Sequence, residues 1–176
     1  MQKTGLVRSC LGIALLSCFL SGCLGYGFRG SVNNLPEDIK AISIPIFVNE
    51  SIEAGAEVVF ANALVYEFTR SRILQVAPEA EAQAVISGKI KSISEESVVY
   101  ATQTQALERR VIVVLEVSCH RSDNQKVLWQ NLYLSRYETF KASDDSYQNQ
   151  RNKEEAIKKI AQDLSERIHN GILENF

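Results

Sequence analysis

The feature that most constrains the fold is a long alternation of apolar residues between Leu107 and Arg121. One face of this segment is formed by Val111, Val113, Leu115, Val117 and Cys119, and the other mixes isoleucine and valine with polar residues. A period of two sustained over this length is typical of a β-strand. The segment is therefore predicted to be the strongest strand of the chain.

Other patterns predict further strands and two helices. Strands are expected over residues 39–48, 73–76, 84–100 and 127–140. A turn near Gln103-Thr104 would join the two longest strands, and a turn at Asp123-Asn124 would join the next pair. In the first of these, Ile42, Ile44, Ile46 and Val48 share one face. Apolar stripes with helical spacing predict helices over residues 56–72 and 151–173. The stripe of the last helix consists of Ile157, Ile160, Ala161, Leu164, Ile168 and Ile172.

Two helices and a meander of strands predict an α+β fold. Its form would be a two-layer sandwich, with a mixed sheet of about four strands and both amphipathic helices on one face. Agreement between the turns and the alternation predicts a register in which Gly88 pairs with Cys119, Cys119 with Leu128, Leu115 with Leu132, and Val113 with Leu134. The same register places Lys91 opposite Glu116.

The second face of this sheet is less polar than a solvated face should be. It would carry Ile112, Val114, Trp129, Tyr133 and Tyr137 among the basic residues Lys89, Arg110 and His120, with Arg136 nearby. A contiguous exposed apolar patch indicates a partner or a ligand. A covering loop, or a register wrong by one residue, would explain the pattern equally well. We predict Ile112, Trp129, Tyr133, Tyr137, Lys89, Arg110 and Arg136 as contact residues.

The N-terminus has the build of a bacterial lipoprotein signal. Lys3 and Arg8 form a short positive region, residues 10–20 are an apolar run, and the run ends in Leu20-Ser21-Gly22-Cys23. The run is too short to span a membrane as a permanent helix. Small residues before a cysteine resemble the lipobox, whose thiol is acylated and becomes the first mature residue. An ordinary signal peptide cleaved nearby is the alternative.

Cleavage before Cys23 would divide the chain into three parts. These are a lipoprotein signal peptide at residues 1–22, a lipidated tether at residues 23–35 and a single α+β domain at residues 36–176. Covalent lipid on Cys23 is the only attached group predicted, and it would anchor the chain at a membrane surface. Leu24 stands where an aspartate would favour the inner membrane, which points to the outer membrane.

Composition argues against several functional classes. Without the signal, 17 basic and 21 acidic residues remain, a net charge of −4, which gives no electrostatic footprint for nucleic acid. Cys119 would then be the only free thiol, so no intramolecular disulfide is expected. His120 and His169 have no further ligands at metal-binding spacing. Nucleophile elbows and phosphate loops are missing from the sequence, and we predict a protein that is not an enzyme and has no metal site.

Several stretches, taken in order, resemble the LPS-assembly lipoprotein family, LptE. They are residues 23–30, Leu35-Pro36, residues 44–49, Asn62-Ala63-Leu64, residues 84–90, the strand from Arg110, Val127-Leu128-Trp129, and a closing helix with Ala156-Ile157 and Ala161. The chain departs from the family pattern at Leu24, which is inserted between the cysteine and the first glycine. The segment at residues 101–105 also lacks basic residues.

The resemblance implies a plug inside the lumen of the outer-membrane barrel LptD. Members of the family help this barrel to assemble and assist lipopolysaccharide delivery to the cell surface. The expected partners are therefore LptD and lipopolysaccharide, and the expected location is the periplasmic side of the outer membrane. A second class stays open: a periplasmic-facing lipoprotein that activates a peptidoglycan synthase or forms part of a secretion pore.

Overall fold

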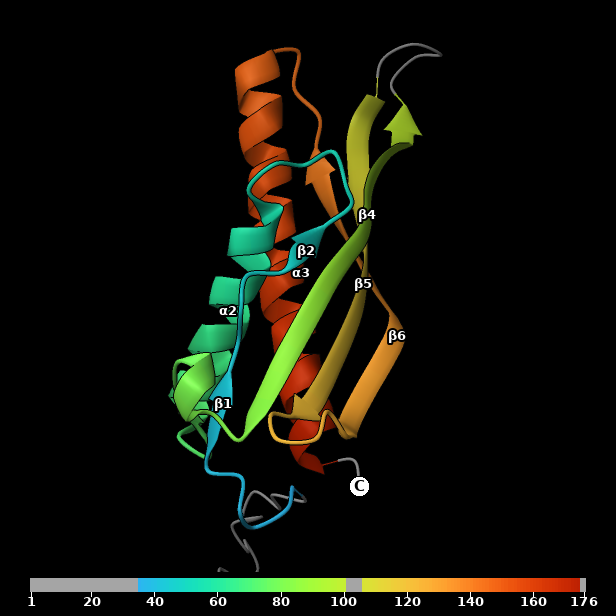
Figure 1. Cartoon of the computed structure of the whole chain (residues 1–176). Coiled ribbons are helices and arrows are strands. Elements are labelled where there is room, and N and C mark those ends of the chain that lie inside the picture. The colour runs from blue at the N-terminus through green and yellow to red at the C-terminus, as the bar shows by residue number, and fades with distance from the viewer. Residues whose placement is uncertain (1–34, 101–105, 175–176) are drawn as a thin grey trace, which may run out of the picture. The chain divides into compact units, whose positions relative to one another are not determined.

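The computed structural model describes residues 35–100 and 106–174 (Figure 1). Its strands are β1 (Ala41–Ser43), β2 (Val48–Asn49), β3 (Gln75–Val76), β4 (Ala84–Tyr100), β5 (Ala106–Arg121) and β6 (Val127–Lys141). The helices are α2 (Ala56–Ser71), α3 (Ser146–Glu174) and the short 3₁₀ helix η2 (Glu79–Glu81). One mixed sheet has the order β3-β1-β4-β5-β6, and β2 also pairs with β4.

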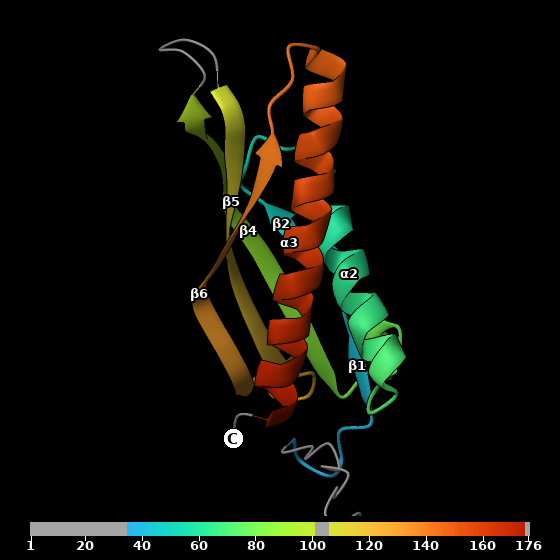
Figure 2. The ribbon, with the colours of Figure 1, turned by 180° about the vertical axis from the view of Figure 1, so that it is seen from behind.

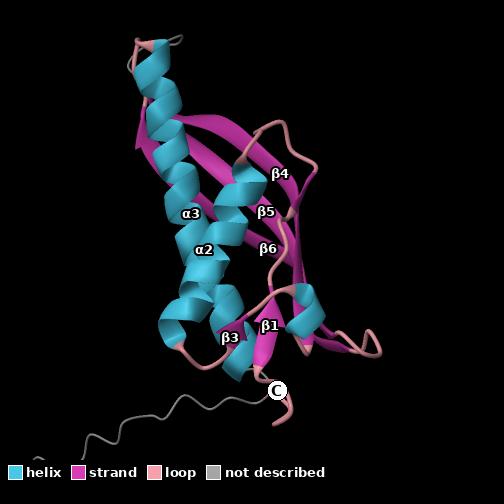
Figure 3. Ribbon diagram, turned by 60° about the vertical axis from the view of Figure 1, so that its left-hand side comes forward, coloured by secondary structure: helices cyan, strands magenta, loops and turns pink. Residues whose placement is uncertain are grey.

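Helices and sheet form two layers, as predicted. Figure 3 shows α2 and α3 together in front of the sheet, and in Figure 2 α3 crosses in front of the strands. The prediction of an α+β two-layer fold is confirmed. Among the described residues the sheet has six strands instead of about four, because β1, β2 and β3 are short strands that pair in parallel.

The apolar stripe of α3 faces the core as predicted. All six of its stripe residues are buried, and Leu164 and Ile172 are fully buried. The helix begins at Ser146, five residues before the predicted start, and the side chain of Asp145 accepts hydrogen bonds from the backbone N–H groups of Tyr147 and Gln148. This side chain satisfies donors that a helix N-terminus otherwise leaves free.

The prediction for the first strand is wrong in its second half. The chain leaves the sheet after β1 and returns only at β2, so Ile46 between them is 66% exposed. Val48, the first residue of β2, is 57% exposed. Phe47 enters the core in their place and lies over Gly88 of β4. Only glycine leaves room at that position for an aromatic ring.

Strands β4 and β5 pair two residues away from the predicted register. Cys119 pairs with Ile86, and Gly88 pairs with Val117. Up to Ile90 the shift is an even number, so these side chains keep their predicted face. A register shift between Ile90 and Ser92 changes the face of the residues beyond it, and Ile93 is buried there. Glu116 pairs directly with Lys89.

The pairing of β5 with β6 is shifted from the predicted register by one residue near Cys119 and by two residues from Leu115 to Val113. Cys119 pairs with Trp129, where Leu128 was expected, whereas Leu115 pairs with Leu134 and Val113 with Arg136. Register shifts between Leu115 and Val117 and between Cys119 and His120 account for the difference. A bulge adds residues to one strand only, so the alternation alone does not reveal it. The predicted turn at Asp123-Asn124 is confirmed, and the expected turn near Gln103 lies outside the described residues.

Candidate functional site

The candidate site is the open face of the sheet, defined as the side of β4, β5 and β6 that points away from α2 and α3. None of the described helices covers it (Figures 1 and 3). On β5 the odd-numbered residues from Val111 to Cys119 are buried beneath the helices, so Ile112, Val114 and His120 lie on the open face. Arg110, Lys89 and Tyr137 join them through the strand registers.

Two of the predicted contact residues lie on the opposite side of the sheet. Trp129 faces α3, because a Cβ atom added to Gly171 would stand 2.8 Å from its ring. Arg136 also faces α3, where its guanidinium lies 2.8 Å from the carboxylate of Asp163. The placement of Trp129 on the second face is therefore wrong, and Arg136, expected near that face, lies on the side of the helices. For Trp129 the physical reason is the bulged register of β6, which shifts its pairing by one residue. Arg136 pairs with Val113, two residues from the expected partner Leu134, so the expected register gives it the same side of the sheet.

Exposed apolar groups gather at the centre and edge of the open face. Tyr137 and Tyr133 are 54% and 73% exposed, and Tyr133 lies in the bulge of β6. A shallow depression of about 200 Å³ is bordered by Val48 and Leu132, which are also exposed, and by Lys89. The alternation predicts a buried face for Val48 and Leu132, so the sequence carried no signal that could have identified them.

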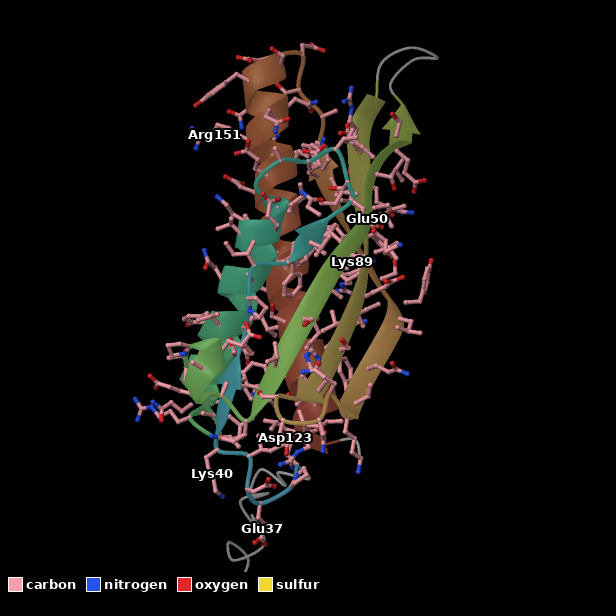
Figure 4. All side chains as sticks on the ribbon, viewed as in Figure 1. Glu37, Lys40, Glu50, Lys89, Asp123 and Arg151 are labelled. Atoms are coloured by element: carbon pink, nitrogen blue, oxygen red, sulfur yellow. The ribbon has the colours of Figure 1, made fainter. Side chains whose placement is uncertain are left out.

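The lysines of this face are already paired with carboxylates. Glu50 lies 3.3 Å from the amine of Lys89 and 2.8 Å from that of Lys91, and Figure 4 shows Glu50 and Lys89 next to each other. Hydrogen bonds from Lys91 and then Lys89 hold the pKa of Glu50 below its ordinary value. Lys91 also reaches Glu116 at 3.7 Å.

Arg110 has a similar environment near the tip of the hairpin. Its guanidinium lies 3.1 Å from the carboxylate of Glu96 and 4.5 Å from the ring centre of Tyr137. The cation therefore holds the Tyr137 ring by a cation–π contact. An incoming phosphate would have to compete with Glu96 for this guanidinium.

The described residues contain no group of acidic, histidine and cysteine side chains that could hold a metal ion. Cys119 is buried, and burial raises the pKa of its thiol to about 12. A thiol with such a pKa is a poor nucleophile at neutral pH. The buried ring of His169 packs edge-on against Phe68, with 4.9 Å between the ring centres.

The family model for LptE, described as lipopolysaccharide-assembly, matches residues 39–172. The chain belongs to this family. The match spans the chain from just before β1 into the last turns of α3, so it includes the complete open face. A comparison with curated proteins found no match for this LptE-family chain.

Solved structures of other bacterial proteins share the fold. Lipoprotein B from Nitrosomonas europaea is 15% identical, with a TM-score of 0.53, and the match covers 82% of this chain and 88% of that one. A hypothetical protein from Chlamydia trachomatis (10% identity, TM-score 0.52) is matched over 78% and 99% of the two chains. A minor lipoprotein from Acinetobacter baumannii (11% identity, TM-score 0.50) is matched over 78% and 92%.

Within residues 35–100 and 106–174, neither helix combines the length and the apolar character needed to cross a membrane. The predicted signal peptide and the lipid attachment site at Cys23 lie outside the described residues.

Proposed function

We propose that this LptE-family protein is a lipoprotein subunit of the outer-membrane lipopolysaccharide translocon. In this role it plugs the LptD barrel, helps the barrel to assemble and assists lipopolysaccharide delivery to the cell surface. The observation that carries the proposal is the family match over residues 39–172. The open face supports it, because a plug must present side chains to a surrounding wall as well as to its own core.

The proposal includes anchoring through lipid on Cys23. A single acyl chain gives only marginal attachment, and stable anchoring requires more than one. A Cys23→Ala chain should lose labelling by palmitate and leave the membrane fraction, and its domain should still fold because α2, α3 and the sheet lie elsewhere in the sequence. Palmitate incorporation by the alanine variant would show that acylation, if any, occurs at another residue.

Contacts with the barrel are assigned to the apolar part of the open face, above all to Tyr133 and Tyr137. Aromatic residues near the centre of an interface often contribute about 2 kcal/mol or more each. Lys89 and Arg110 are secondary candidates, since their carboxylate partners Glu50 and Glu96 offset their charge toward lipid phosphates. Contact through these cations would weaken with added salt, and contact through the tyrosines would not.

Affinity purification from detergent-solubilised outer membranes tests the function. A β-barrel protein retained in equal amount supports the proposal, and a retained penicillin-binding protein in place of a barrel overturns it in favour of the peptidoglycan alternative. Tyr133→Ala should reduce the retained barrel without changing the melting temperature, because the side chain is 73% exposed. Leu164→Ala, which affects the buried core, serves as the contrasting variant whose melting temperature falls.

A further inference from the structure

Strand β6 is the last strand of the sheet, and no described strand pairs with its outer side (Figure 1). The side-chain amide of Asn152 on α3 donates a hydrogen bond of 2.9 Å to the carbonyl oxygen of Lys141. This carbonyl therefore points away from β5. Backbone groups of a strand alternate in direction, and β6 pairs with β5 without a register shift from Leu134 to Lys141. Ser135, Tyr137 and Thr139 consequently also direct their N–H and C=O groups outward.

The ladder is irregular in the lower half of this edge, Val127 to Tyr133, and regular in the upper half, Leu134 to Lys141. In the lower half the strand bulges, and the side chain of Asn131 accepts the N–H of Tyr133 at 3.0 Å. In the upper half the sequence has no proline and the register has no bulge. Its two internal charges, Arg136 and Glu138, are turned under the sheet to Asp163 and Lys159 on α3.

The opposite margin of the sheet has features that hinder pairing with strands of other chains. Above β2, β4 carries Lys91 and Glu96 on the open face, and its ladder with β5 is irregular after Ser97. Exposed charges and bulges are the devices by which proteins prevent their edge strands from pairing with other chains. The upper half of β6 has no bulge, so its outward N–H and C=O groups stay aligned for pairing from Ser135 to Thr139.

A groove of about 280 Å³ runs beside the free edge, between β6 and α3. Its lining consists of Glu138, Thr139, Phe140, Lys141, Asn152, Glu155, Ala156 and Lys159. A strand placed next to β6 would direct alternate side chains into this groove and onto the open face. The groove is mainly polar and charged, whereas the open face offers the exposed ring of Tyr137.

We propose that the edge of β6 from Ser135 to Thr139 binds an extended segment of a partner protein by strand addition. The segment has apolar or aromatic residues that lie beside Tyr137 on the open face, and polar residues that enter the groove beside α3. Backbone hydrogen bonds supply the affinity, and the alternating side chains supply the specificity.

A single segment fits this edge better than a second copy of the chain. Neighbouring strands lie about 4.8 Å apart, and α3 packs mainly beneath β6. A second copy paired through its own β6 would bring its α3 into the same layer. Packed helices need about 8–10 Å between their axes, so the two copies of α3 would collide.

Residue-resolved amide hydrogen exchange tests the proposal. The full chain with a C-terminal tag is isolated from detergent-solubilised membranes of its own host, together with what it retains, and is compared with the chain alone. Exchange at Ser135, Tyr137 and Thr139 should slow by about 100-fold in the complex. Exchange at Arg136 and Glu138, whose N–H groups already face β5, should change little. Unchanged exchange at the first three residues, with or without a retained partner, overturns the proposal.

A matched pair of variants removes or keeps one donor at the edge. Thr139→Pro deletes an outward N–H, which an edge strand tolerates, and should reduce the retained partner at least about tenfold. Thr139→Val keeps the donor and should retain the partner. If Thr139→Pro lowers the melting temperature, the proposal is tested by the amide exchange of the unaltered chain and not by partner retention of this variant. Slow exchange in the purified chain, accompanied by a doubled mass, overturns the proposal in favour of self-pairing.

The outcome is separable from that of the proposed function. A retained barrel with fast exchange at the three amides keeps the translocon role and removes strand addition. Retention of a protein of another class, together with slowed exchange at Ser135, Tyr137 and Thr139, keeps strand addition and removes the translocon role.

Discussion

Gly88 of β4 provides the most demanding test of how the core is built. A Cβ atom at this position would overlap the ring of Phe47, which is only 4% exposed and is enclosed by the core. Overpacking of this kind costs about 1–3 kcal/mol, and the depth of the overlap places Gly88→Ala at about 2–3 kcal/mol of lost unfolding free energy. Phe47→Ala alone should cost about 3–5 kcal/mol.

The informative quantity is the effect of Gly88→Ala in the Phe47→Ala background. The overlap is then absent, and alanine is favoured over glycine in a strand by about 0.5–1 kcal/mol, so the substitution should become stabilising. Urea unfolding of the four proteins, followed by far-UV circular dichroism, gives a coupling energy expected near about 3 kcal/mol.

Gly55→Ala is the matched control, because its cost arises from a backbone φ of 87° and no atom lies near its added Cβ. It should cost about 1–2 kcal/mol in both backgrounds. If Gly88→Ala instead cost the same with and without the Phe47 ring, the reasoning that Phe47 requires this glycine would be refuted.

Three further predictions concern buried and paired groups. Leu164→Ala should lower the unfolding free energy by about 2–5 kcal/mol, since Leu164 is fully buried; an unchanged urea midpoint would contradict its place in the core. Because burial raises the pKa of Cys119 to about 12, its thiolate is scarce at about pH 8, and Ellman's reagent should react with it only as fast as the domain opens. Hydrogen bonds from Lys91 and Lys89 lower the pKa of Glu50, so its stabilisation exists above the unfolded pKa and disappears as the pH falls through the folded pKa. Melting temperatures of Glu50→Gln and the unaltered chain should therefore converge in acid, and a difference that persisted there would argue against these ion pairs.

The sequence by itself determined the elements whose burial pattern is regular and long. The stripe from Ile157 to Ile172 identified the buried side of α3, and the alternation from Val111 to Cys119 identified both faces of β5. Each of these patterns repeats often enough that only one orientation buries the apolar residues. Family membership likewise followed from motifs spread along the chain, and the match over residues 39–172 confirms it.

The tertiary structure alone decided which side of the sheet several candidate contact residues occupy. Both faces of β6 carry apolar residues, so its sequence does not distinguish one register from the next. The choice depends on partners that are distant in sequence: Gly171 makes room for Trp129, and Asp163 pairs with Arg136. In the same way Phe47 displaces Ile46 from the core because Gly88 leaves space for its ring. Local periodicity describes the chain along its length, whereas these choices depend on complementary shapes and charges brought together only by folding.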